Sequence, residues 1–220
     1  MKILTAQSKP DSITAGIAPR TADPESLWVT TRRYGLRPAP GGLALVQDLL
    51  NTRANTEHGL DLLSDATHAQ EWVELAAFAW AARRGVESAP PALTDHDASK
   101  LRDLRDTVDG LLAGGSPQSA QRLDGVPELV LLKGGEIYWA PTGQGWRWVS
   151  CAILGEVLLS RHNHNGTWER LKQCRNSACR VTFYDRSWNT SEIWHHRVMC
   201  GQAFTDHDAV QNQTLQANLS

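Results

Sequence analysis

The sequence predicts an α+β protein: a mainly helical body with a small antiparallel β-meander, followed by a compact module organised around cysteines. Apolar residues recur with a helical period in three stretches, and short β-rich runs separated by turn residues follow them. Three of the four cysteines then fall within 27 residues near the C-terminal end. With 220 residues, 41% of them hydrophobic, the chain is long enough for one core plus this module.

Residues 1–40 differ in character from the rest of the chain. Five prolines punctuate a polar stretch that lacks a helical period. We therefore expect an irregular N-terminal arm, in which Leu27-Trp28-Val29 docks as a strand or plug.

The body, residues 41–165, opens with three expected helices. Each has an apolar stripe at helical spacing, and two of them also carry start and stop signals. The expected helices are Leu43 to about Arg53, then Ala66 to Arg83 after the cap Ser64-Asp65 and before Gly85, then Thr94 to Leu112 before Gly114-Gly115.

The period then changes from helical to strand-like. The runs 129–132, 136–139 and 145–149 predict a three-stranded meander, with Lys133-Gly134-Gly135 as a tight hairpin turn. Ser150 is expected to cap a further helix, which leads into the C-terminal module.

The C-terminal module contains Cys174-x4-Cys179, an aromatic run, and then Trp194-His195-His196 ahead of Cys200. The N-terminus lacks the apolar core of a secretory signal, so we expect a cytoplasmic protein with reduced thiols rather than disulfides. Three thiolates and one imidazole form a closed tetrahedral set for zinc, which indicates a structural ion rather than a catalytic one. The alternative is a group of reduced cysteines with no metal.

The identity of the fourth ligand depends on local structure. Ser191 is a candidate cap for a short helix that begins near Glu192. On such a helix His196 and Cys200 are four residues apart and share a face, whereas His195 is five residues from Cys200. Helical geometry therefore favours His196.

The segment from Leu171 to Gly201 resembles the CGNR zinc finger, whose usual pattern is C-x4-C, an aromatic strand, an R/N-rich turn, and W-C-x4-C-G-N-R. The resemblance implies a finger over 166–205, a polar tail over 206–220, and Cys174, Cys179, His195 and Cys200 as the ligands. His195 takes the position of the cysteine that follows the tryptophan. The preceding order of a Leu43-Ala44-Leu45…Asn51-Thr52 opening, helices and a small sheet is similar to the ABATE domain, so the body is expected to be ABATE-like.

Members of the family with this finger are usually described as transcription regulators, so the resemblance implies DNA binding and a body that senses a small-molecule effector or partner. Six of the 22 basic residues but two of the 24 acidic residues lie between Arg170 and Cys200. No lysine or arginine follows Arg197, where the family continues into a basic helix. The candidate nucleic-acid contacts are Lys172, Arg175, Arg180, Arg186 and Arg197.

A ligand pocket in the body is the remaining functional hypothesis. Polar groups at the end of the first helix and histidines beside the finger are its candidate residues: Asn51, Arg53, His162, His164 and His196. The alternative function is a biosynthetic or metabolic enzyme that uses a pocket between body and finger, with zinc purely structural. We expect no membrane span, because no run of about 18 apolar residues exists. The sequence does not decide between a monomer and a homodimer.

Overall fold

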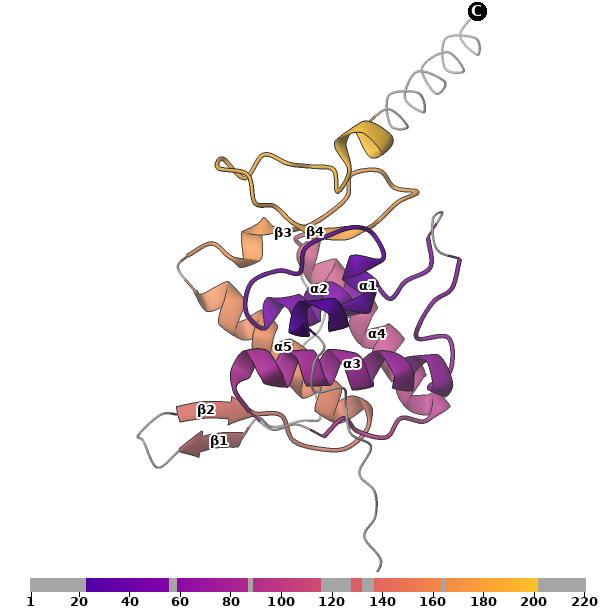
Figure 1. Cartoon of the computed structure of the whole chain (residues 1–220), viewed down its shortest axis with the longest axis vertical. Coiled ribbons are helices and arrows are strands. Elements are labelled where there is room, and N and C mark those ends of the chain that lie inside the picture. The colour runs from indigo at the N-terminus through magenta and orange to yellow at the C-terminus, as the bar shows by residue number, and fades with distance from the viewer. Residues whose placement is uncertain are drawn as a thin grey trace, which may run out of the picture.

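The computed structural model describes residues 23–55, 59–86, 89–115, 128–131, 137–163 and 165–201. Figure 1 shows a helical body with the C-terminal module at one end and a hairpin at the other. The fold is α+β with an added metal-binding module, as predicted. The elements are η1 (Pro24–Leu27), α1 (Val29–Arg32), α2 (Leu43–Leu50), α3 (Ala66–Arg84), α4 (Asp95–Leu112), β1 (Glu128–Leu131), β2 (Ile137–Ala140), α5 (Trp146–His162), η2 (Trp168–Arg170), β3 (Leu171–Gln173) and β4 (Thr182–Tyr184).

Helix α2 runs through the middle of the body, and all of its side chains are buried, including the polar Gln47 and Asp48. It packs against α1, α3, α4 and α5. The helix ends at Leu50, earlier than the predicted Arg53. Asn51 caps the helix, and its side chain bonds the C-terminal module, as described below.

The long helices α3 and α4 confirm the predicted start and stop signals. The Asp65 side chain accepts a hydrogen bond from His68 N at the start of α3, and Gly85 ends that helix in the left-handed region at φ 67°. Thr94 and Asp97 form a reciprocal capping box at the start of α4. Further along α4, buried Arg105 forms two charge-assisted hydrogen bonds of 2.8 and 2.7 Å to the Asp61 carboxylate.

The predicted third strand over 145–149 is wrong, because these residues begin α5. Gly145 has φ 56°, and a Cβ there would collide with the Asp97 carboxylate, which accepts a hydrogen bond from Trp146 N at 3.0 Å. This contact from α4 caps α5 at Trp146, so Ser150 lies inside the helix instead of capping it. The sheet therefore has two antiparallel strands among the described residues, with Leu129 opposite Trp139. The predicted turn at Lys133–Gly135 lies outside the described residues.

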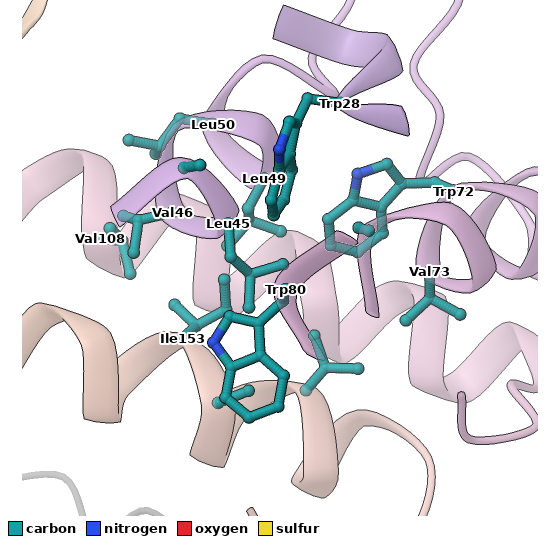
Figure 2. Packing of buried hydrophobic residues seen from close by; sticks show 14 of the residues in the cluster. Trp28, Leu45, Val46, Leu49, Leu50, Trp72, Val73, Trp80, Val108 and Ile153 are labelled. Atoms are coloured by element: carbon teal, nitrogen blue, oxygen red, sulfur yellow. The ribbon is translucent and has the colours of Figure 1, made fainter. Parts of the chain in front are cut away.

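Tryptophans form the centre of the core. Trp28, Trp72 and Trp80 are fully buried around α2 and α5 (Figure 2). Two of their indole N–H groups donate to buried carboxylates: Trp72 to Asp48 at 3.0 Å and Trp80 to Glu156 at 2.7 Å. Each buried acid thus satisfies an indole that would otherwise lose a hydrogen bond to water.

The N-terminal arm is less irregular than predicted over residues 24–32. Leu27-Trp28-Val29 docks on the body through helical turns rather than as a strand, because the Trp28 ring enters the core and η1 packs against α3. Residues 1–22 and 206–220 lie outside the described residues, and the proposed domain boundaries stay predictions. None of the described helices has the combination of length and apolar character that a membrane crossing requires.

Candidate metal centre

The first two cysteines lie on a tight turn that connects β3 to β4. Cys174 N donates to Val181 O at 2.8 Å, which continues the pairing of the two strands past β3. Inside the turn, Asn176 accepts hydrogen bonds through its carbonyl and side chain, including one from Cys179 N at 3.0 Å. Arg180 then takes a positive φ of 55° to leave the turn. This geometry directs both sulfurs toward one point.

The other two ligands flank the start of a helical segment over residues 197–201. The His195 Nδ1 atom lies 3.2 Å from Cys179 Sγ and 3.3 Å from Cys200 Sγ. The ligand atoms of Cys174, Cys179, His195 and Cys200 all lie within 4.8 Å of one another. The structure therefore brings together the set that the family resemblance implied.

His196 is not part of this group, so the helical argument for it is wrong. The predicted helix from Glu192 starts later, at Arg197, and Ser191 instead donates from its hydroxyl to Asn189 at 2.7 Å. His196 lies at the position just before the helix, exposed, where its Nδ1 accepts from Met199 N at 3.3 Å. It acts as a helix cap because the first N–H groups of a helix lack internal partners.

The donor set fits zinc. Zinc binds sulfur at about 2.3 Å and nitrogen at about 2.0 Å, so tetrahedral coordination holds a sulfur and a nitrogen ligand about 3.5 Å apart. This is close to the distances of His195 Nδ1 from the Cys179 and Cys200 sulfurs. All three cysteines are buried and none is in a disulfide. Three sulfurs and one imidazole complete a tetrahedron, so the ion would be structural. Tyr34, Leu36 and Trp194 pack against this cluster.

The three sulfurs lie close enough to change one another's pKa. The Cys179 thiol donates a hydrogen bond to the Cys174 sulfur and, with His195, lowers the pKa of Cys174 to about 4. Burial, together with the Cys174 charge, raises the pKa of Cys200 to about 11. Hydrogen bonding to Cys174 and burial likewise raise the pKa of Cys179. A divalent ion bound at this point would stabilise all three sulfurs as thiolates.

A buried aspartate organises the turn between β4 and the second pair of ligands. Asp185 accepts hydrogen bonds from Lys172 Nζ at 2.7 Å, from Glu192 N at 3.0 Å and from Ser187 N at 2.8 Å. Despite the opposing effect of burial, the bonds from Lys172 and Ser187 lower the pKa of Asp185 to about 2. Sequence reasoning missed this residue, although an acid directly after a buried strand was a usable signal.

The finger is joined to the body by hydrogen bonds from the end of α2. Asn51 bonds both backbone groups of Thr182 in β4, accepting from N at 2.8 Å and donating to O at 2.9 Å. Gln47 donates to the same carbonyl at 3.3 Å, and Asn55 donates to Cys179 O at 3.2 Å. The Asn51 amide thus pairs with the free edge of β4 in the way that a residue of a neighbouring strand would.

The residues of the hypothesised body pocket do not assemble into one site. Asn51 and Arg53 share a hollow of about 10 Å³, which holds no more than one water molecule. Arg53 pairs with Asp106 at 2.7 Å. His162 is exposed, with its Nδ1 2.9 Å from the Leu158 carbonyl. His196 caps its helix, and His164 lies outside the described residues.

All five candidate nucleic-acid contacts lie within the segment from β3 to the last described helix. Three are engaged within the molecule: Lys172 in the Asp185 network, Arg180 with Asp109 at 2.7 Å, and Arg186 with the Pro38 carbonyl at 2.7 Å. Arg175, Arg180 and Arg197 are exposed on the finger.

Comparison with known proteins agrees with this geometry. No curated protein matches the chain. The expected ABATE character of residues 41–165 stays a prediction. Residues 170–205, the segment that contains all four ligands, match the CGNR zinc finger family.

Proposed function

We propose that this chain is a regulatory protein whose zinc finger binds duplex DNA while its body receives an effector or partner. The observation that carries the proposal is the buried Cys3His group inside a segment that matches a zinc finger family. A closed ligand set leaves no open position for substrate, which supports a structural ion and a binding role.

The contacts to DNA rest on Arg175 and Arg197. Both side chains are exposed, and they lie on the two halves of the finger, beside Cys174 and ahead of Cys200. The remaining candidates, Lys172, Arg180 and Arg186, hold the finger together or fix it to the body. Their loss would therefore alter the structure or attachment of the finger as well as its charge.

The attachment of the finger to α2 supports a regulatory link. Gln47 projects from α2, whose side chains are all buried, and Asn51 directly follows the last residue of that helix. Both side chains bond Thr182 in the finger. A ligand that shifts the body would therefore also shift the finger, because packed interiors transmit displacement rather than absorb it.

The test is fluorescence anisotropy of labelled duplex DNA with zinc-loaded protein. Two phosphate contacts predict a slope of log K against log salt of roughly −2, measured from about 50 to about 200 mM salt. Arg175→Gln and Arg197→Gln should each flatten the slope by about 1. Arg147→Gln is the matched control, because Arg147 is exposed at the start of α5 in the body.

The DNA proposal fails if the zinc-loaded protein does not bind duplex DNA even at the lowest salt. It also fails if the control and both finger variants give the same slope as the parent protein.

A further inference from the structure

A cleft of about 940 Å³ lies where the finger meets the body. Its body side comes from the ends of α4 and α5, and its finger side from β3 and the cysteine turn, elements that lie together in Figure 1. The volume is within the range of small-molecule sites, about 300 to 1,000 Å³. Of the four zinc ligands only Cys174 is among its lining residues, so the cleft adjoins the metal centre without containing it.

The charge of this cleft is positive. Four basic residues line it, Arg161, Lys172, Arg175 and Arg180, against the two acids Asp109 and Glu169. Asp109 is already matched inside the protein: Arg180 donates to it at 2.7 Å, Gln173 at 2.7 Å, and Arg53 lies 3.5 Å away. Glu169 is exposed, as are Arg161 and Arg175, so water screens these three charges alike. Over the whole lining, basic residues outnumber acidic ones by four to two, with Lys172 paired to Asp185 and Arg180 paired to Asp109.

Arg161 is the strongest candidate for direct contact with a ligand. Its side chain is exposed on the last turn of α5, and its guanidinium lies 5.9 Å from the centre of the Trp168 ring. Within the described part of the chain, no acceptor receives a hydrogen bond from that guanidinium. Its planar set of donors is thus available to a carboxylate or phosphate.

Apolar side chains complete the lining. Leu111 and Leu112 come from the end of α4, while Trp168, Leu171 and Ile193 come from the segments that enter and close the finger. Ile193 is 40% exposed. Leu111 and Leu112 are half-buried, whereas Trp168 and Leu171 are buried. A ligand that covers Ile193, Leu111 and Leu112 would remove apolar surface from water, which favours binding in proportion to the area covered.

We propose that the cleft binds an organic anion with an apolar body, its carboxylate or phosphate head held by Arg161 from the body and Arg175 from the finger. This assigns a chemical class to the effector, and only its regulatory consequence rests on the proposed function. Because the two arginines belong to opposite sides of the joint, the bound head group bridges body and finger.

Isothermal titration calorimetry with three probes that share an eight-carbon chain tests the site. We expect octanoate and octyl phosphate to bind the zinc-loaded protein at least about tenfold more tightly than octanol, because only the anions pair with guanidinium groups. Arg161→Gln should weaken both anions about tenfold and leave octanol unchanged. Comparing the two anions shows whether the head group is a carboxylate or a phosphate.

Arg147→Gln provides a matched control, because Arg147 is also exposed on α5 and lies over a tryptophan ring, 5.2 Å from that of Trp146. It should bind all three probes as the parent does. The inference is overturned if octanol binds as tightly as the anions, or if Arg161→Gln binds them unchanged. The titrations contain no DNA, so their failure leaves the DNA result intact, and loss of DNA binding leaves the titrations intact.

Discussion

Replacing Asn51 by alanine should destabilise the protein through the finger. Asn51 is 2% exposed and Thr182 is 1% exposed, so water cannot replace the two hydrogen bonds between them, which are 2.8 and 2.9 Å long. Each buried backbone group left without a partner costs about 1–3 kcal/mol. Gln47 still reaches the Thr182 carbonyl at 3.3 Å and offsets part of one loss. We therefore expect a total loss of about 2–4 kcal/mol.

The assay is urea unfolding of zinc-loaded protein, followed by tryptophan fluorescence. Asn163→Ala is the control, since Asn163 is exposed at the end of α5 and its loss should change stability by no more than about 0.5 kcal/mol. The reasoning is refuted if Asn51→Ala lowers the unfolding free energy by less than about 1 kcal/mol, because the pairing with β4 would then contribute little.

Three further predictions concern the metal and the ion pair between Asp61 and Arg105. Cys174→Ser should lose stoichiometric zinc and the ordered finger, by metal analysis and near-ultraviolet circular dichroism, while Cys151→Ser, at a buried thiol outside the cluster, should keep both. His195→Ala should lower zinc affinity strongly in a competition titration with a chelator, whereas equal losses in His196→Ala would contradict the assigned ligand. Burial alone would raise the pKa of Asp61, but the hydrogen bonds from Arg105 outweigh that effect and lower it. The stability this gives is present above about pH 4 and is lost as pH falls through the lowered value. The Asp61 side chain is 25% exposed, so its pair with Arg105 is only partly buried. Asp61→Asn should therefore cost about 1–3 kcal/mol at neutral pH, and urea unfolding should show the difference shrinking below about pH 4.

The sequence predicts the helices of the body well, because their ends are encoded locally. Asp65, Gly85 and Thr94 act on residues within four positions of themselves, and the structure confirms their roles. The start of α5 could not be predicted from neighbouring residues. Its cap is Asp97, 49 residues earlier, and the alternating Trp146-Arg147-Trp148 pattern indicates a strand when that contact is unknown.

The metal centre is encoded by residues close together in the sequence, whereas the cleft is not. The spacing of the three cysteines and the histidines predicts the finger from the sequence. Choosing His195 over His196 required the family resemblance. The helical argument for His196 failed because the helix starts at Arg197 rather than at Glu192. The cleft combines short pieces of α4, α5 and the finger, none with a motif of its own. Arg161 and Trp168 gave no sequence signal because only the folded chain places them beside the finger.

The contact of α2 with β4 also decides whether the finger is a portable unit. A peptide of residues 170–201 would contain every metal ligand, yet it would lack the Asn51 amide that completes its hairpin and the Tyr34 and Leu36 side chains that cover its sulfurs. Transplanted to another protein, it would expose these surfaces to water and hold its ion less firmly. The module and the helices beneath it must therefore change together in evolution and be exchanged together in engineering.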